Sequence, residues 1–320
     1  MTHSAAGGKI QETDISRYRS TRGLDYESVP WKLWEKSKKL FWDPADIDFS
    51  QDAIDWREMT DEERTLVALS ARGFMVGEEA VTLDIVPLLR CMSDLGRLED
   101  TMYLSMFAME EAKHTEMFRR WFDAVGLDPA SLDDLVLERQ AAAGQQRPGV
   151  FDGALTRVMR RLDTDKSPQA ILDASIIYNQ LVEGVMAIAG YQRWEQTFLR
   201  LKKLPGLEAG LKLTQRDERR HIAYGTYLGR RVLAENPELW EWLEKRWAKL
   251  TAGFSGGGYG AAGSQGPQNE VERANAELME RYQRLSKRRL EALAVARTMN
   301  VTEVDASAVE AFEPEELQHA

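Results

Sequence analysis

Cysteine is almost absent from this chain, and its scarcity removes several classes of protein from consideration. Cys91 is the only cysteine among the 320 residues. A single thiol cannot form an internal disulfide, a four-thiolate zinc site or a cysteine-ligated iron–sulfur cluster. The composition therefore fits a reducing compartment, and we expect the protein to be cytoplasmic.

Long apolar runs are also missing. No stretch of 18 apolar residues occurs, and the most apolar segment, residues 171–194, is interrupted by polar side chains that include Asp173 and Glu183. Residues 1–14 contain no apolar segment of signal-peptide length. We therefore expect neither a transmembrane segment nor a secretion signal.

An excess of basic charge is the third absence. The chain has 42 lysines and arginines against 52 aspartates and glutamates, which gives a net charge of -10. No basic stripe is long enough to follow a phosphate backbone, so a nucleic-acid partner is not expected.

Histidine is scarce as well, and the positions of the four histidines are informative. Two lie near the chain ends, and the two internal ones each follow a glutamate by three residues, in Glu111-x-x-His114 and Glu218-x-x-His221. Three residues of α-helix correspond to about 300° of rotation, so each pair would emerge from one helix face. A single Glu-x-x-His motif is readily explained as part of a solvated surface. Two such motifs that include every internal histidine are harder to explain in this way. Two such motifs are typical of four-helix bundles that hold two metal ions, in which each of the other two helices adds a glutamate.

The helix signals predict an all-α fold. A capping box at Thr60 and Glu63 begins the first long helix, Gly126 ends the second, and Ser167-Pro168 begins the third. The expected long helices cover residues 60–91, 95–125, 167–201 and 205–234, and further helices are expected at 238–250 and 269–298. We therefore expect an all-α fold with a four-helix bundle core and additional helices.

We expect a single domain over residues 1–320, with the metal-binding core of the bundle at about 60–235. Mobile tails are predicted at 1–20 and 300–320, and a flexible glycine-rich loop at 253–266. The charge run of the helix at 269–298 is interpreted as a solvated face. An aromatic-rich arm is expected to lie across the bundle and contains Trp31, Trp34, Phe41 and Trp42.

Two further glutamates are needed to complete a dimetal site. Glu183 is the only acid between Asp173 and Glu195 and has apolar neighbours. A lone carboxylate in such surroundings is costly to bury unless it is paired or binds metal, so Glu183 is the predicted third ligand. The first helix offers both Glu78 and Glu79, and periodicity does not choose between them.

The acids beside the two motifs have different expected roles. Glu110 is excluded as a ligand by spacing, because only Glu111 precedes His114 by three residues. Asp217 would accept the second ring N–H of a histidine and fix its tautomer, with an ordinary surface charge as the alternative. Four carboxylates and two imidazoles suit iron or manganese.

Residues 30–235 resemble the ferritin-like dimetal carboxylate proteins, and most closely the small subunit of class I ribonucleotide reductase and its oxidase relatives. Phe41-Trp42-Asp43-Pro44 is similar to the Phe-Trp-x-Pro element of the small subunit, and Asp217-Glu218-x-x-His221 is similar to its last ligand motif. The reductases usually carry a radical tyrosine four residues after the first motif histidine, where this chain has Phe118. One reductase subclass with a manganese/iron centre also has phenylalanine there.

The ligand-binding oxidases built on the small-subunit scaffold are more similar still. That family holds a manganese/iron centre, binds a long-chain fatty acid and forms a tyrosine–valine ether cross-link beside the metals. It places the valine three residues after the glutamate of its first helix and the tyrosine five residues before the glutamate of its third. Glu78 with Val81 and Tyr178 with Glu183 match both spacings. The resemblance therefore selects Glu78 over Glu79.

The cross-link spacing fits a regular helix only in part. Val81 lies about one turn from Glu78, but five residues of ideal helix put Tyr178 about 140° from Glu183. A π-type turn within residues 167–201 would bring the two together, and such turns concentrate at functional sites. Ordinary bundle core is the alternative interpretation of Val81 and Tyr178.

The resemblance implies an oxygen-activating manganese/iron oxidase, with di-iron as a variant, that removes hydrogen from unactivated C–H bonds of an apolar substrate. The implied metal ligands are Glu78, Glu111, His114, Glu183, Glu218 and His221. The implied partners are dioxygen, a long-chain fatty acid or similar lipid, an unidentified electron donor and a second copy of the chain. Small residues at Gly184, Ala187, Ala189 and Gly190 would leave room for a lipid or allow close helix packing.

Two other functions remain as alternatives. A ribonucleotide reductase small subunit would supply an oxidising equivalent to a large subunit through a C-terminal tyrosine, but the last tyrosine here is Tyr282. A ferritin-like iron store would need a cage-forming oligomer, which a chain of 320 residues with a long C-terminal extension suits poorly.

Overall fold

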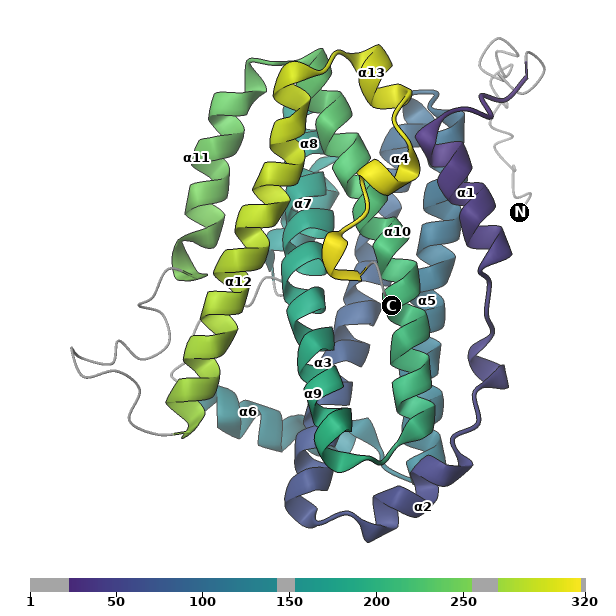
Figure 1. Cartoon of the computed structure of the whole chain (residues 1–320), viewed down its shortest axis with the longest axis vertical. Coiled ribbons are helices and arrows are strands. Elements are labelled where there is room, and N and C mark those ends of the chain that lie inside the picture. Colours follow the sequence, from purple (N-terminus) through teal and green to yellow (C-terminus); the bar gives the residue numbers. More distant parts are fainter. Residues whose placement is uncertain (1–22, 143–152, 255–269, 318–320) are drawn as a thin grey trace, which may run out of the picture.

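A computed structural model of the chain describes residues 23–142, 153–254 and 270–317. Every regular element in these ranges is helical, and four long helical rods run side by side to form the bundle (Figure 1). The rods are α3 (Asp61–Asp84), α5 (Leu98–Val125), the composite rod Pro168–Leu201 and α10 (Pro205–Glu235). The predicted all-α, ferritin-like bundle with additional helices is confirmed.

The first rod begins as predicted but ends earlier. Thr60 accepts a hydrogen bond from the Glu63 N–H while the Glu63 side chain bonds the Thr60 N–H, which is the expected capping box. The helix expected over 60–91 is divided at Ile85 into α3 and α4 (Val86–Asp94). Pro87 lies in the first turn of α4, where its missing N–H leaves no hydrogen bond unmade, so the proline begins a helix there.

The second and third rods follow the sequence prediction closely. Gly126 ends α5 in the left-handed conformation, with φ of 71°. The third rod consists of α8 (Pro168–Ser175), a π-helical segment η6 (Ile176–Ala187) and α9 (Ile188–Leu201). The π-type turn that would bring Tyr178 and Glu183 together is therefore present, and it covers both residues. Within the described residues this rod alone is long and apolar enough to cross a membrane, but 89% of its most apolar window is buried inside the bundle.

The start of α10 is fixed by the short helix α2 (Ser50–Glu58). The Asp52 carboxylate accepts hydrogen bonds from the Gly206 and Leu207 N–H groups at 2.7 and 2.8 Å, and Asp55 accepts one from the Leu204 N–H at 2.7 Å. These are N–H groups that a helix start leaves without internal partners. The contacts hold in register the rod that carries Glu218 and His221.

Additional helices surround the four rods. The arm with α1 (Val29–Lys39) and η3 (Pro44–Asp46) crosses α5 and α10, as expected. The other elements are η4 (Pro129–Leu132), α6 (Asp133–Ala142), α7 (Leu155–Arg161), α11 (Leu239–Thr251), η7 (Ala252–Phe254), α12 (Glu270–Ala294), η8 (Val295–Thr298), α13 (Val301–Asp305), η9 (Val309–Ala311) and η10 (Glu315–Leu317).

The expectation of a mobile tail over 300–320 is wrong for residues 301–317. These residues pack onto the bundle, where the Phe312 side chain is buried and Glu313 pairs with Lys36 at 2.5 Å and with Arg219 at 2.7 Å. The acidic composition alone suggested that chain entropy would keep this segment disordered. Burial of an aromatic side chain and pairing of the carboxylates offset that entropy. The tail at 1–20 lies outside the described residues, as does the glycine-rich loop apart from positions 253 and 254.

The charge run of α12 is only partly a solvated face. Arg289 is 4% exposed and pairs with Glu316 of η10 at 2.9 Å. The interpretation as a solvated face is wrong for Arg289, because its partner Glu316 comes from the C-terminal tail. The sequence did not indicate that this tail would fold back onto the bundle.

Candidate metal centre

The bundle gathers the six candidate ligands in its interior. Glu78 comes from α3, Glu111 and His114 from α5, Glu183 from η6, and Glu218 and His221 from α10. All six side chains are buried, and their oxygen and nitrogen atoms form two groups that share two carboxylates. The first group is Glu78, Glu111, His114 and Glu218, and the second is Glu111, Glu183, Glu218 and His221.

The two shared carboxylates each present one oxygen to either group. Glu111 Oε2 lies 3.5 Å from His114 Nδ1, and Glu111 Oε1 lies 3.3 Å from His221 Nδ1. Glu218 repeats the pattern, with Oε1 at 3.8 Å from the first imidazole and Oε2 at 3.7 Å from the second. This is the arrangement of bridging carboxylates between two adjacent cation positions.

The unshared carboxylates complete one group each. Glu78 Oε2 lies 3.3 Å from His114 Nδ1, and Glu183 Oε1 lies 3.9 Å from His221 Nδ1. Glu79, which periodicity alone left as an alternative to Glu78, is exposed. The geometry therefore agrees with the choice of Glu78 that the resemblance made.

The pair Glu78 and Glu79 offers a matched test. We expect Glu78→Gln to weaken binding at the position beside His114 by more than the roughly 10–100-fold typical of residues that only hold a ligand in place. Glu79→Gln makes the same chemical change on the solvent side and should leave binding unchanged. Metal titration of both variants, followed by elemental analysis, measures the difference. Equal affinities in the two variants would rule out Glu78 as a ligand.

Two acids hold the outer nitrogens of the imidazoles. Asp217 Oδ2 lies 3.2 Å from His114 Nε2, as predicted for a histidine partner of this residue. Glu110 Oε2 lies 2.9 Å from His221 Nε2, a role that the sequence analysis missed. Each carboxylate accepts the outer ring N–H, so that with a cation in place of the second ring proton the Nδ1 lone pair would face the cluster.

A signal for Glu110 was present in the sequence. Both motifs have an acid directly before the ligand glutamate, in Glu110-Glu111-x-x-His114 and Asp217-Glu218-x-x-His221. In the structure each leading acid contacts the histidine of the other motif, so α5 and α10 are joined by two reciprocal contacts. Glu110 lies outside both groups of ligand atoms, in keeping with its spacing, and contacts His221 instead.

Cations and an indole N–H hold these two acids. The Arg220 guanidinium donates to Glu110 Oε1 and to Asp217 Oδ1, both at 2.6 Å. Lys113 Nζ lies 2.7 Å from Asp217 Oδ2, and Trp42 Nε1 donates to the same oxygen at 2.7 Å. The buried Arg220 and Lys113 charges therefore balance the two carboxylates that orient the histidines, and the aromatic arm takes part through Trp42.

Burial sets the protonation of the cluster in the absence of cations. It raises the pKa of Glu78 to about 8 and raises the pKa of Glu183 well above its usual value. For His114 and His221 burial opposes the charged form, but hydrogen bonds to the surrounding carboxylates outweigh it and raise each pKa well above the usual range. Protons thus offset the concentrated negative charge, and divalent cations would replace them.

The residues present fit a pair of metal ions. Four buried ligand atoms have no hydrogen-bond partner: Glu111 Oε2, Glu183 Oε1, Glu218 Oε2 and His221 Nδ1. Unpaired polar atoms of this kind are rare in protein interiors and call for a bound ion or water. Two divalent cations would also balance the four carboxylates with both histidines neutral. Oxygen and imidazole donors without a thiolate suit iron and manganese.

Aromatic side chains line the wall of the cluster. The Tyr178 hydroxyl donates to Glu111 Oε1 at 3.2 Å, and the Phe107 ring stacks on His221 with centroids 3.7 Å apart. Tyr191, which the sequence analysis did not select, donates to Glu218 Oε1 at 3.3 Å. Val81 is 5% exposed and lies one turn beyond Glu78 in α3.

Phe118 occupies the position of the reductase tyrosine. It is fully buried and packs against Phe74, with ring centroids 6.0 Å apart. A phenyl ring cannot form the oxygen-centred radical that a tyrosine forms.

The small residues of the third rod allow close packing. A Cβ at Gly190 would lie 2.5 Å from the Phe74 ring, and one at Gly184 would lie 2.8 Å from Arg289 Cδ. The space at these two glycines is therefore filled by side chains, in agreement with the packing alternative.

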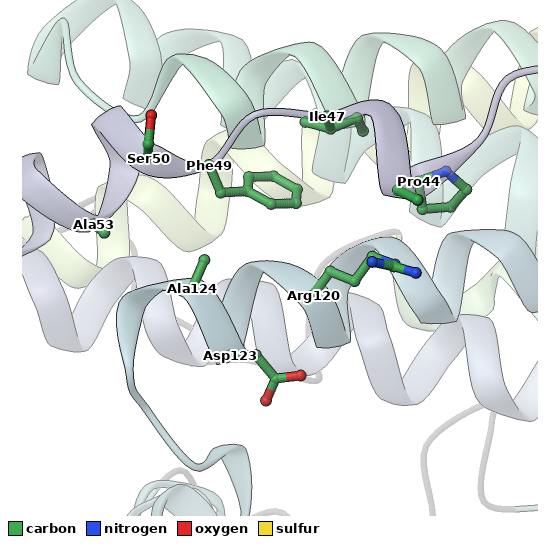
Figure 2. Close-up of a pocket in the computed structure, with 9 residues that line it drawn as sticks. Pro44, Ile47, Phe49, Ser50, Ala53, Arg120, Asp123 and Ala124 are labelled. Carbon is green, nitrogen blue, oxygen red and sulfur yellow. The ribbon is translucent and has the colours of Figure 1, made fainter.

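A surface cavity of about 360 Å³ lies elsewhere, between the η3–α2 segment and the end of α5 (Figure 2). Apolar side chains that include Ile47 and Phe49 face it from one side, and Arg120 and Asp123 lie on the other. None of its lining residues belongs to the carboxylate cluster, so this cavity is separate from the candidate metal centre.

Comparisons with known proteins agree with this site. The family model described as "Ribonucleotide reductase, small chain" matches residues 24–253. The solved structure of R2-like ligand-binding oxidase from Sulfolobus acidocaldarius is 35% identical, with a TM-score of 0.76, and the match covers 91% of this chain and 99% of that chain.

Two variants of an R2-like ligand-binding oxidase are also similar. A valine-to-leucine variant with an aerobically reconstituted Mn/Fe cofactor is 32% identical, with a TM-score of 0.68, and the match covers 86% of this chain and 97% of that chain. A glycine-to-leucine variant with a non-activated Mn/Mn cofactor is also 32% identical, with a TM-score of 0.68, and the match covers 88% of this chain and 96% of that chain.

Proposed function

The chain belongs to the ribonucleotide reductase small-chain family, and on this basis we propose that it is an oxygen-activating manganese/iron oxidase that binds a long-chain fatty acid and forms a Val81–Tyr178 ether. One observation carries the proposal: two shared carboxylates, Glu111 and Glu218, face two adjacent cation positions, and a tyrosine donates to one of them. Di-iron occupancy is the variant that the same donors would accept.

The proposed roles follow from the contacts. Glu78 and His114 would hold one ion and Glu183 and His221 the other, with Glu111 and Glu218 bridging them. When bound, the two ions supply the redox capacity that lets dioxygen oxidise an unactivated C–H bond. Asp217 and Glu110 fix the imidazole tautomers, and the Phe107 ring covers His221 and keeps water from that side.

The cross-link is a two-electron oxidation of the protein itself. The bond formed joins the Val81 β-carbon to the Tyr178 oxygen, and the bonds broken are Cβ–H of Val81 and O–H of Tyr178. Two protons and two electrons pass to dioxygen, which they reduce to the level of hydrogen peroxide. The hydrogen bond to Glu111 holds the phenol oxygen beside the cluster, and the π-helical segment η6 supplies the side-chain register that an α-helix would not.

Peptide mass spectrometry tests this reaction. We expect protein loaded anaerobically with manganese and iron, then exposed to air, to yield a linked peptide pair lighter by two hydrogens than the sum of its parts. Tyr178→Phe lacks the bond-forming oxygen and should yield none. Full metal loading in air without any linked pair would contradict the proposed cross-link.

The lipid ligand is proposed from the similarity to the R2-like ligand-binding oxidase. A long apolar chain with a carboxylate would direct its charged end to the cations. Native mass spectrometry of the metal-loaded protein, with lipid extraction, would identify a fatty acid; a lipid-free protein would contradict this part of the proposal.

The reductase alternative is weaker than the oxidase. Residues 309–317 pack against the bundle, and Phe118 stands where most reductases carry a radical tyrosine. Nucleotide reduction on addition of a large subunit would restore this alternative.

We propose a homodimer, in keeping with the family. Four apolar side chains on α3, α4 and α5, three helices that contact one another, are exposed at 37–66%: Val76, Leu83, Val86 and Met109. Exposed apolar groups of this kind mark interaction surfaces. Leu83→Asp should therefore shift the protein from dimer to monomer in sedimentation velocity, whereas Leu137→Asp, an equally exposed leucine on α6, should not. A dimer that persists in Leu83→Asp would exclude this face.

Cys91 is consistent with the proposed cytoplasmic location. The thiol is fully buried, and burial raises its pKa to about 11. It is therefore an unreactive side chain of the core.

A further inference from the structure

The two oxygens of the Glu183 carboxylate have different surroundings. The Asn179 amide, one turn earlier in η6, donates a hydrogen bond to Glu183 Oε2 at 3.0 Å. Glu183 Oε1 has no hydrogen-bond partner and lies 3.9 Å from His221 Nδ1. One oxygen is thus bound by an amide of the protein, and the other is left to face a cation.

Packing alone does not explain an asparagine at position 179. The side chain is fully buried, and its amide oxygen Oδ1 has no hydrogen-bond partner. A buried acceptor without a partner is costly, and leucine would occupy a similar volume without that cost. The group that leucine lacks is an N–H donor for Glu183. We therefore attribute the asparagine to this one hydrogen bond.

The facing helix leaves room for the Asn179 side chain. Gly225 lies in the interior of α10, where glycine is less favourable than alanine. A Cβ at Gly225 would lie 2.0 Å from Asn179 Cβ and 2.4 Å from Asn179 Cγ, so no larger residue fits without displacing the amide. Gly225 also follows His221 by four residues, on the same face of α10. The glycine therefore lets Asn179 approach the α10 backbone within reach of Glu183.

Two hydrogen bonds beside this contact join the same parts of the two rods. Ser175 Oγ donates to the Gly225 carbonyl oxygen at 2.9 Å, and Gln180 Nε2 donates to Thr226 Oγ1 at 3.2 Å. Neither hydrogen bond includes a candidate metal ligand. The position of the Asn179 amide along α10 is therefore set by the packing of the rods, and not by the carboxylate that it binds.

A fixed N–H donor restricts how Glu183 would bind a cation. A carboxylate can bind through one oxygen or through both. Binding through both would require the Glu183 carboxylate to turn away from the Asn179 amide. That turn would leave a buried N–H without a partner, which is unfavourable. Binding through Oε1 alone keeps the hydrogen bond intact.

We propose that Asn179 is a positioning residue that limits Glu183 to one oxygen and so keeps a coordination position open at the ion beside His221. Gly225 is the second part of this device, because it gives the amide its place. The external ligand for the open position would be the carboxylate of the substrate, and this assignment rests on the proposed function.

Cobalt(II) provides a test that does not depend on oxidase activity. Oxygen and imidazole donors accept this ion, and its visible absorption is stronger with five ligands than with six. The full-length protein is loaded anaerobically with cobalt and titrated with azide, a small anion that takes an open coordination position. We expect azide to bind to the unaltered protein and to change the cobalt spectrum.

Asn179→Leu and Asn179→Met both remove the N–H donor, and their different shapes guard against a packing defect in either one. In both variants we expect the cobalt content to stay unchanged and the absorption before azide addition to weaken. The azide affinity should fall by about 10–100-fold, the range typical of residues that hold a ligand in place. Gln180→Met is the control, because Gln180 is also a buried amide but binds Thr226. Its spectrum and azide affinity should match those of the unaltered protein.

Gly225→Ala, which would displace the amide, should reproduce the weakened absorption of the Asn179 variants. Unchanged spectra and azide affinities in both Asn179 variants would overturn the proposal, as would an unaltered protein that binds cobalt but no azide. Loss of a cobalt ion from both variants would also overturn it, because Glu183 would then need the amide in order to bind at all. A failure of the proposed oxidase would instead appear as a missing Val81–Tyr178 cross-link in the manganese/iron protein, with the cobalt results intact.

Discussion

Glu111→Gln is expected to reduce the metal content of the protein from two ions per chain to one or none. Glu111 is one of two carboxylates shared by both groups of ligand atoms, with its oxygens 3.5 Å from His114 Nδ1 and 3.3 Å from His221 Nδ1. Glutamine keeps the shape but loses the charge and one oxygen acceptor, so it cannot bridge two cations. Elemental analysis after anaerobic loading with manganese and iron measures the stoichiometry.

The neighbouring residue supplies the control. Glu110→Gln makes the same change one position away, at a carboxylate that contacts the outer nitrogen of His221. We expect this variant to retain two ions with affinity lowered by about 10–100-fold. If Glu111→Gln still bound two ions, or if the two variants behaved alike, the assignment of Glu111 as the bridge would be wrong.

Arg220→Met is expected to destabilise the fold by about 3–5 kcal/mol, the cost of breaking a buried ion pair by removing one partner. Arg220 is 1% exposed and binds Glu110 and Asp217, and its Nε also donates to Ser37 of α1 at 2.9 Å. Methionine fills the volume but leaves two buried carboxylates with one fewer cation. Urea unfolding, followed by circular dichroism, gives the change in the free energy of unfolding.

An exposed arginine of α5 provides the control, because its replacement removes an arginine without breaking the buried ion pairs. Arg119 pairs with Asp123 on the helix surface, and such exposed pairs contribute little. We expect the unfolding midpoint of Arg119→Met to match that of the unaltered protein. Equal midpoints for the two variants would show that the buried network is not needed for stability.

The helical rods and their ligand motifs were accessible from the sequence because their signals are local. Spacing of three residues, a capping box and a closing glycine each act within one or two turns, and the structure shows the Thr60 cap and the Gly126 terminus where expected. Glu183 was accessible for a different reason, since a single acid within an apolar helix must find a partner.

The parts that the sequence analysis missed depend on contacts between distant segments. Glu110 acquires its role from His221, which is 111 residues away. The order of residues 301–317 depends on Lys36, Arg219 and Arg289, which local composition cannot reveal. Tyr191 was likewise not selected, because only the fold brings it to Glu218.

The crossed contacts between α5 and α10 have a consequence for how the two ions would be chosen. The acid that precedes each ligand glutamate supports the histidine of the opposite motif, and both glutamates face both positions, so an ion at one position would constrain groups of the other. Affinities at the two positions are then thermodynamically linked, and the coupling is equal in both directions. A protein built this way selects a pair of ions as a unit, so the identity of the first ion bound would influence which element follows it.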